Sequence, residues 1–187
     1  MDNNNKATND IDAIPSLVQS QRQIDRYNLD MDAQAILVAS RLMAAGAKLG
    51  HASEIHFSRF GLSTGRYRLL ADLEDNEGEE LPSQLAEHLG VTRATVTGLI
   101  DVLERDGLVS RRFSSEDGRQ RSVMLTEEGA KKLREMAPEH FARLEAMVGL
   151  LNIEERSVFL DLLGRVTQGI SALTDKTVKS KENISNE

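Results

Sequence analysis

The fold is decided by residues 81–126, which read LPSQLAEHLGVTRATVTGLIDVLERDGLVSRRFSSEDGRQRSVMLT. Pro82 suits the first position of a helix because its missing N–H would have no partner there. Gly90 is expected to end that helix, and Thr92 can cap the next one by accepting a hydrogen bond from a free backbone N–H. This stretch therefore predicts two short helices joined by a tight turn.

The second of these helices has one apolar stripe and one unusual exposed side. The stripe repeats at the helical interval and consists of Val96, Leu99, Ile100 and Leu103. A helix turns by about 100° per residue, so the side of its first two turns that lies away from the stripe can be listed. Apart from Arg93, it carries small and hydroxylated residues, which are Ala94, Thr95, Thr97 and Gly98. Because glycine costs about 1 kcal/mol against alanine inside a helix, Gly98 indicates that another molecule approaches this backbone.

The major groove of DNA is wide enough to hold such a helix. Arginine, threonine and the backbone N–H groups at a helix N-terminus suit base edges and phosphates. The residues that we predict to bind in the major groove are Thr92, Arg93, Thr95 and Thr97. The alternative is a plain helical hairpin with a tolerated glycine.

A β-hairpin is expected directly after the second helix, over residues 108–126. Val109, Arg111 and Phe113 lie on one side of its first strand, as the alternation of a strand requires. The run SSEDGRQ forms the turn. A helix-turn-helix followed by such a hairpin predicts a winged helix-turn-helix.

The hairpin tip holds Arg119 beside Gly118. Arginine is drawn into the minor groove by its negative potential, so we predict that Arg119 binds there. Asp117 would repel phosphate if it were free, and we interpret it as the partner that holds this arginine. A solvated hairpin tip is the alternative.

The run from Val91 to Gly129 resembles the MarR family of bacterial winged-helix repressors. The motif that carries the resemblance is Asp, any residue and Arg, followed by an apolar-Leu-Thr strand end and a glycine three residues later; here it is formed by Asp117, Arg119, Met124, Leu125, Thr126 and Gly129. The likeness covers most of residues 32–172. It implies a homodimer, with its interface on the first helix and the last two, that binds two half-sites of a near-palindromic double-stranded DNA.

Composition sets further bounds. The chain has 187 residues, 40% of them hydrophobic, which is enough for one domain with a core. It has no cysteine, so disulfides and thiolate metal sites are excluded. The net charge is −7, but residues 91–125 hold six arginines and five acids, a net of +1, so DNA binding remains compatible with the charge.

The remaining sequence predicts helices. Ser16 starts an additional N-terminal helix, residues 30–60 form a long helix that is apolar on more than one side, and Asn76 to Glu80 add a short third strand. Pro138 kinks or restarts the helix after Thr126, and Asn152 with Glu155 three residues later predicts a capping box at the start of a last helix. Surplus apolar surface of this kind favours a two-fold partner. The expected division is a disordered N-terminus (1–13), N-terminal dimerisation helices (14–61), the winged helix-turn-helix lobe (62–126), C-terminal dimerisation helices (127–174) and a disordered tail (175–187).

Further candidate sites lie on and around these helices. Ser83 and Arg111 are predicted to contact phosphates. The family resemblance implies a small aromatic or anionic effector, for which the candidate residues are His51, Phe57, Arg59, Tyr67 and Arg68. A metal site at His51, Glu54 and His56 is disfavoured because these residues lack a clear two-histidine helical spacing.

Neither a catalytic motif nor a phosphate-binding glycine loop occurs, so we expect no enzyme and no cofactor. No apolar run approaches the roughly 20 residues that cross a bilayer, and the N-terminus does not read as a signal peptide, so the expected location is the cytoplasm. The sequence thus predicts a mainly α-helical protein with a small β-hairpin wing, acting as a homodimeric transcriptional repressor released by an effector. A winged-helix module that binds another protein is the alternative.

Overall fold

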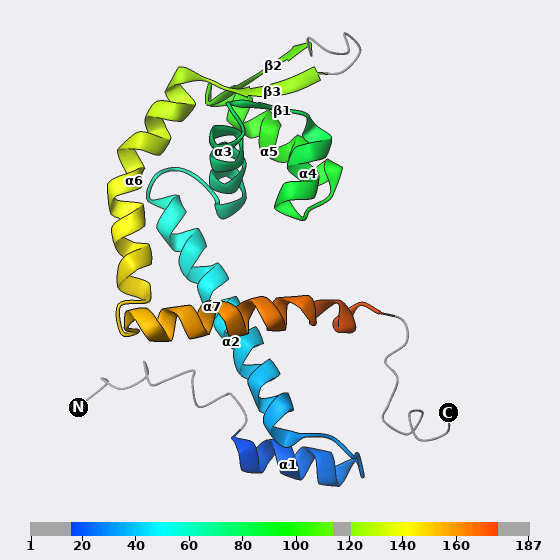
Figure 1. Ribbon diagram of the computed structural model, residues 1–187. Coiled ribbons are helices and arrows are strands. Elements are labelled where there is room, and N and C mark those ends of the chain that lie inside the picture. Colours follow the sequence, from blue (N-terminus) through cyan, green and yellow to red (C-terminus); the bar gives the residue numbers. More distant parts are fainter. Residues whose placement is uncertain (1–15, 114–120, 176–187) are drawn as a thin grey trace, which may run out of the picture. The chain divides into compact units, whose positions relative to one another are not determined.

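The computed structural model describes residues 16–113 and 121–175 (Figure 1). Along the chain the elements are α1 (Leu17–Arg26), α2 (Ala33–Ser58), α3 (Thr64–Asp75), β1 (Glu79–Glu80), α4 (Pro82–Leu89), α5 (Arg93–Arg105), β2 (Val109–Phe113), β3 (Arg121–Leu125), α6 (Glu127–Met147), α7 (Ile153–Gln168) and the 3₁₀ helix η2 (Ile170–Leu173). They fall into two compact units, which divide between Leu133 and Arg134. The N-terminal segment 1–13, almost all of the tail 175–187, and the wing-tip residues Asp117 and Arg119 lie outside the described residues.

The first unit contains a three-stranded antiparallel sheet in the order β1-β3-β2. Arg111 of β2 and Glu80 of β1 both lie opposite Val123 of β3, which is fully buried. The hairpin over residues 108–126 and the short third strand are therefore confirmed. In Figure 1, α3, α4 and α5 lie together on one side of this sheet.

The core of this lobe is aliphatic. Its fully buried side chains come from α3, α4, α5 and β3 and from the segment before α3, and they are Leu62, Leu69, Leu70, Leu73, Leu85, Val96, Ile100, Leu103 and Val123. The stripe predicted for α5 supplies three of them, and its fourth member, Leu99, is half-buried. Since the stripe packs inward, the opposite side of α5 faces solvent.

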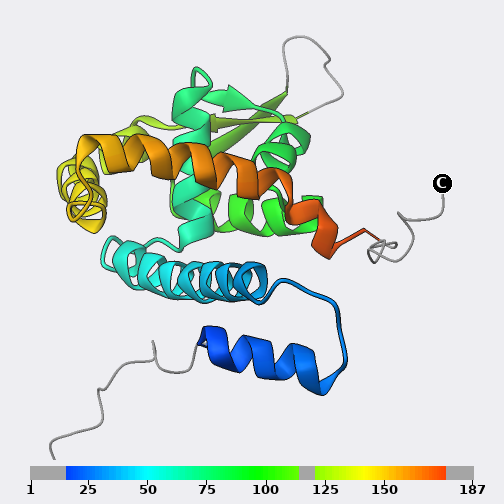
Figure 2. The same cartoon turned by 60° about the horizontal axis from the view of Figure 1, so that its bottom comes forward.

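The additional N-terminal helix is confirmed as α1. Ser16 caps it by accepting from the backbone N–H of Gln19 at 3.3 Å, and the Gln19 side chain accepts from the backbone N–H of Ser16 at 2.7 Å. Ser20 and Ile24 are buried, and α1 lies beside α2 (Figure 2). Helix α1 thus packs on α2 within the subunit, while most of α2 stays exposed.

Hydrogen bonds of Thr126 join the start of α6 to the segment before β2. The Thr126 hydroxyl accepts from the backbone N–H of Gly129 at 3.1 Å and donates to the carbonyl of Gly107 at 2.7 Å. A Cβ on Gly129 would lie 2.2 Å from the carbonyl oxygen of Leu108, so the chain can pass here only without a side chain. This contact gives a physical reason for the glycine in the motif that ends the wing.

Two expectations for the last helices have different outcomes. Pro138 was predicted to kink or restart this helix; it does not restart it, since α6 runs through Pro138 to Met147, and a kink there stays a prediction. Proline removes one backbone hydrogen bond, and at this exposed position the flanking turns continue the helix. The predicted capping box of α7 is confirmed, because Asn152 accepts from the N–H of Glu155 at 2.8 Å and Glu155 accepts from the N–H of Asn152 at 2.9 Å.

Within the described ranges, every helix falls short of the length and apolar character that a bilayer crossing requires.

Candidate nucleic-acid interface

Helices α4 and α5 are joined by a turn whose shape depends on Gly90. Gly90 has φ +66°, a left-handed conformation that glycine adopts without the steric cost of a Cβ. The backbone N–H of Gly90 then donates to the Glu87 carbonyl and that of Val91 to the Ala86 carbonyl, both at 3.1 Å. Backbone hydrogen bonds therefore close the turn. Three residues separate the end of α4 at Leu89 from the start of α5 at Arg93.

The N-terminus of α5 is capped as predicted. The Thr92 hydroxyl oxygen accepts from the backbone N–H of Thr95 at 3.1 Å, and the two threonine hydroxyls lie 2.9 Å apart. The remaining N–H groups of the first turn point out of the N-terminal end of α5, where the helix dipole favours negative charge. This end of α5 can therefore accept a phosphate.

The four predicted major-groove residues all lie on the exposed side of α5 or at its cap. The Thr97 hydroxyl donates to the carbonyl of Arg93 at 2.9 Å. Its oxygen therefore remains an acceptor, and its methyl group can contact the methyl group of a thymine. Arg93 is exposed at the first position of the helix.

Gly98 explains why this side of α5 is open. A Cβ built on Gly98 would meet nothing within 4 Å, so no contact within the described residues requires a glycine there. The fold would tolerate a side chain, and alanine would suit the helix better. The missing side chain therefore favours the close approach of another molecule.

The start of α4 presents a second exposed group. Pro82 occupies the first helical position, as predicted, and the backbone N–H of Leu81 donates to the Gln84 side chain at 2.9 Å. Ser83 lies in the first turn, where it is exposed. Its hydroxyl and the neighbouring backbone N–H groups are suited to a phosphate oxygen.

Arg111 has partners that sequence reasoning missed. Its guanidinium forms ion pairs with Asp101 and Glu104 of α5, and its side chain is 22% exposed. Its backbone N–H donates to Glu104 at 3.1 Å. Two acids thus already hold the arginine predicted to contact a phosphate, and Arg111 braces β2 against α5.

The wing continues from these strands, but its tip, with Asp117 and Arg119, is outside the described ranges. The predicted hold of Asp117 on Arg119 and the minor-groove contact therefore remain predictions. The described strands run to Phe113 on one side and from Arg121 on the other. Phe113 pairs with Arg121 at the end of the described strands.

The residues predicted to bind an effector lie on α2, α3 and the segment between them. Phe57 is buried and stacks on Tyr67, with ring centroids 4.1 Å apart. Burial raises the pKa of Tyr67, and the nearby Asp75 and Glu74 add to this effect. Arg68 donates to the carbonyl of Leu89 at 3.2 Å, while His51 and Arg59 are exposed. Phe57, Tyr67 and Arg68 therefore have structural contacts of their own.

A capped helix with an open, side-chain-poor face, preceded by a short helix across a tight turn and followed by a β-hairpin, defines a winged helix-turn-helix protein of the DNA-binding class. The family model described as MarR family matches residues 60–120. The chain is 37% identical over 147 residues to the HTH-type transcriptional repressor YetL of Bacillus subtilis (strain 168), covering 78% of this chain and 88% of that protein.

Two further comparisons agree with this similarity to MarR family regulators and transcriptional repressors. The chain is 29% identical over 148 residues to the transcriptional repressor MprA of Escherichia coli (strain K12), covering 79% of this chain and 82% of that protein. Among solved structures, Sco3205, a MarR family transcriptional regulator from Streptomyces coelicolor in complex with DNA, matches with a TM-score of 0.69 and 25% identity, covering 75% of this chain and 89% of that chain. The chain belongs to the MarR family and is a winged-helix transcriptional regulator.

Proposed function

We propose that this regulator binds a near-palindromic DNA sequence as a homodimer and represses transcription from it. The observation that carries this proposal is the open face of α5 around Gly98, where an added Cβ would meet no atom of the described residues within 4 Å. Two relatives, YetL and MprA, bear the name of repressors, which supports the direction of the effect.

The proposed contacts divide by their chemistry. Thr92, Arg93, Thr95 and Thr97 read base edges in the major groove, where threonine and arginine suit both hydrogen bonds and methyl contacts. Ser83 binds a phosphate at the start of α4. Arg119 enters the minor groove with Asp117 holding it. Arg111 contributes through its remaining N–H groups, because Asp101 and Glu104 already engage its guanidinium.

The second unit supports the homodimer. No residue of α7 is buried within the subunit. The large apolar side chains exposed along α7 are Ile153, Val158, Phe159, Leu160, Leu162, Leu163 and Val166. An exposed apolar helix of this kind marks an interaction surface, and a second copy of the chain would supply the second recognition helix that a palindrome requires.

Selection of bound fragments from random DNA tests the proposal. We expect a palindromic consensus with half-sites about one helical turn apart. Fluorescence anisotropy with that sequence at increasing salt should give a log–log slope of about −0.9 per phosphate contact. If the winged helix instead binds a protein, no consensus will emerge and affinity for the protein partner will depend only weakly on salt.

We also propose that a small aromatic or anionic effector releases the DNA. The support is the aromatic stack of Phe57 on Tyr67 between α2 and α3, with Arg68, Arg59 and His51 on the same elements or between them. An effector acts only if it binds the DNA-free state more tightly than the bound state. Benzoate is a suitable first probe: it should lower operator affinity in the wild type and do so less in Arg68→Gln. Equal release in both proteins would remove Arg68 from the effector site.

The same proposal involves no catalytic step, and it places the regulator in the cytoplasm, where its DNA lies.

A further inference from the structure

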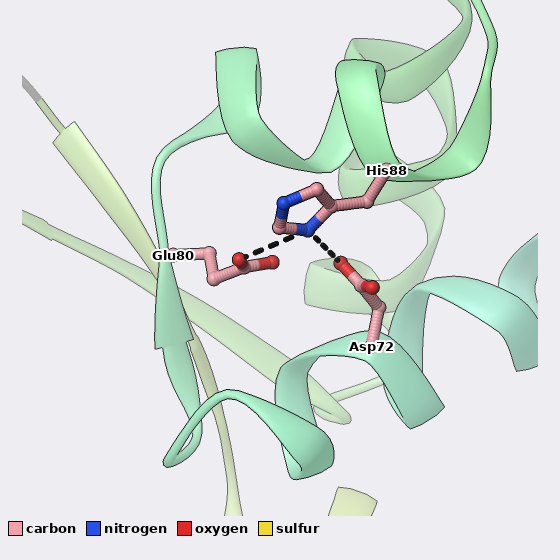
Figure 3. A group of neighbouring side chains, drawn as sticks. All are labelled: Asp72, Glu80 and His88. Carbon is pink, nitrogen blue, oxygen red and sulfur yellow. Dashed lines mark hydrogen bonds and ion pairs between the residues drawn. The ribbon is translucent and has the colours of Figure 1, made fainter.

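Three side chains from three elements meet in the winged-helix lobe (Figure 3). They are Asp72 of α3, Glu80 of β1 and His88 of α4. The Nδ1 atom of His88 lies 3.1 Å from Asp72 Oδ2 and 3.2 Å from Glu80 Oε1. One nitrogen and two carboxylate oxygens thus lie within 4.8 Å of one another.

The protein does not satisfy this cluster by itself. A ring nitrogen carries at most one proton, so His88 Nδ1 cannot donate a full hydrogen bond to both carboxylates. Glu80 is 7% exposed, and its Oε2 atom is buried without a hydrogen-bond donor from the part of the chain that the structure describes. Buried carboxylates normally occur with a paired charge or a metal ion. Burial raises the pKa of Glu80 to about 7, Asp72 adds to this effect and His88 opposes it.

We propose that Asp72, Glu80 and His88 bind one divalent transition-metal ion of the zinc class, through His88 Nδ1 and one oxygen of each carboxylate. A tetrahedral ion with ligands at about 2.0–2.1 Å separates neighbouring ligand atoms by about 3.3 Å. The observed separations of 3.1 and 3.2 Å from His88 Nδ1 match that value. The site is therefore preorganised for the ion with little movement of the histidine.

The donor set selects the class of metal. Calcium and magnesium prefer all-oxygen ligand sets, whereas an imidazole nitrogen with two carboxylates suits zinc and the neighbouring transition metals. The His88 side chain is 42% exposed, so the fourth position of a tetrahedral ion faces water. Three protein ligands with water in the fourth position are a coordination that zinc commonly adopts in proteins.

The site joins three parts of the lobe. Asp72 lies near the end of α3, Glu80 ends β1, and His88 lies in the last turn of α4, the first helix of the helix-turn-helix. A bound ion would cross-link these elements and stabilise the folded lobe, since a ligand that binds only the folded state adds to its stability. None of the three ligands lies on the exposed side of α5, so metal binding can be tested without DNA.

The test uses the full-length protein, freed of metal with a chelator and then freed of the chelator. Zinc is titrated in competition with a colorimetric zinc indicator, and thermal melting is followed by circular dichroism with and without one equivalent of zinc. We expect one zinc ion per chain and a higher melting temperature with zinc. Cobalt in place of zinc should give the visible absorption of a tetrahedral ion with nitrogen and oxygen ligands.

Two ligand variants and one control make the test specific. His88→Gln and Asp72→Asn should each bind zinc at least tenfold more weakly and lose the zinc-dependent shift, with unchanged circular dichroism showing that they fold. Glu135→Gln removes an exposed carboxylate of α6 and should bind zinc as the wild type does. Failure of the wild type to bind zinc, or equal binding by the wild type and both ligand variants, would overturn the proposal and leave a proton shared among the three side chains as the explanation of the cluster.

Discussion

Arg111 and Glu104 are joined at two points: the backbone N–H of Arg111 donates to Glu104 Oε1 at 3.1 Å, and its guanidinium pairs with Glu104 Oε2. Asp101 engages the same guanidinium. One positive charge from the wing therefore partly offsets two of the acids late in α5. This pairing fixes β2 against α5 and reduces the repulsion that these carboxylates would exert on a phosphate.

Removing this arginine should loosen the lobe. Arg111→Ala should lower the free energy of unfolding by about 1–3 kcal/mol, because the partly buried guanidinium that joins β2 to Glu104 and Asp101 of α5 is lost with its charged hydrogen bonds. Urea denaturation measures the change. Arg112→Ala, one residue along the same strand and exposed, is the matched control and should change it by less than about 0.5 kcal/mol. Equal effects of the two substitutions would show that the pairing with α5 contributes nothing.

Substitutions of Gly98 should affect the stability of the fold and the affinity for DNA in opposite directions. Gly98→Ala should raise the free energy of unfolding by about 0.5–1 kcal/mol, since alanine is the better helix former and its Cβ has open space. Gly98→Glu should fold but bind the selected operator at least tenfold more weakly, because a long acidic side chain would stand between the helix and the groove. Urea denaturation and fluorescence anisotropy provide the two measurements. Operator binding by Gly98→Glu at wild-type strength would mean that this face does not approach the duplex.

Gly129 should behave in the opposite way to Gly98. Gly129→Ala places a Cβ 2.2 Å from the carbonyl oxygen of Leu108 and 2.7 Å from a side-chain carbon of Leu125, so backbone has to move. We expect a loss of about 3 kcal/mol in the free energy of unfolding, the scale of overpacking at a site that cannot relax. Gly98→Ala is the control, measured under the same denaturation conditions. A Gly129→Ala protein as stable as the wild type would refute the close contact between α6 and the strand.

The proposed dimer depends on the apolar surface of α7. Phe159 is 50% exposed in the subunit, and Phe159→Glu would bury a carboxylate without a partner if a second copy covers this helix. Dimerisation should weaken about 30-fold or more, the scale of a large interface side chain, and sedimentation velocity should then show monomers at low micromolar concentration. Gln168→Glu adds the same charge at a polar position of α7 and should remain dimeric. A dimeric Phe159→Glu protein would exclude α7 from the interface.

Tyr67 should titrate above the ordinary tyrosine pKa of 10.0, because burial disfavours its phenolate and two nearby acids oppose the negative charge. The folded state therefore holds this proton more tightly than the unfolded chain does. The stability that Tyr67 contributes is complete below pH 10 and is lost as the pH rises through its folded pKa. Ultraviolet absorbance of a Tyr27→Phe variant measures Tyr67 alone, since the chain has two tyrosines. Ionisation at or below the ordinary pKa would contradict this assignment.

Much of the fold follows from local signals in the sequence. Helix starts were predicted at Thr92, Asn152 and Ser16, because a cap side chain accepts a hydrogen bond from a backbone N–H only three residues later. The structure confirms all three caps. The exposed side of α5 follows from helical periodicity. Pro138 does not restart the helix, one of its two predicted effects, because a proline weakens one turn and the neighbouring turns can continue the helix.

The contacts between distant residues are beyond such signals. Arg111 meets Glu104 and Asp101 through the packing of β2 on α5, and strand alternation alone cannot show which acid lies beside it. Asp72, Glu80 and His88 come from three elements, so no spacing along one helix or strand relates them. Gly129 is part of the sequence motif that resembles the MarR family. The need for a glycine there comes from the carbonyl oxygen of Leu108, 21 residues earlier, which leaves no room for a side chain.

The recognition face of α5 is built largely from threonine, alanine and glycine, with Arg93 at its edge. Such side chains have few rotamers, so immobilising them against a duplex costs little conformational entropy, in contrast with the lysine and glutamate of an ordinary surface. The contact therefore begins from a nearly rigid template. Affinity lost by adding a flexible side chain there would consequently contain an entropic part that grows with temperature, in addition to any steric block.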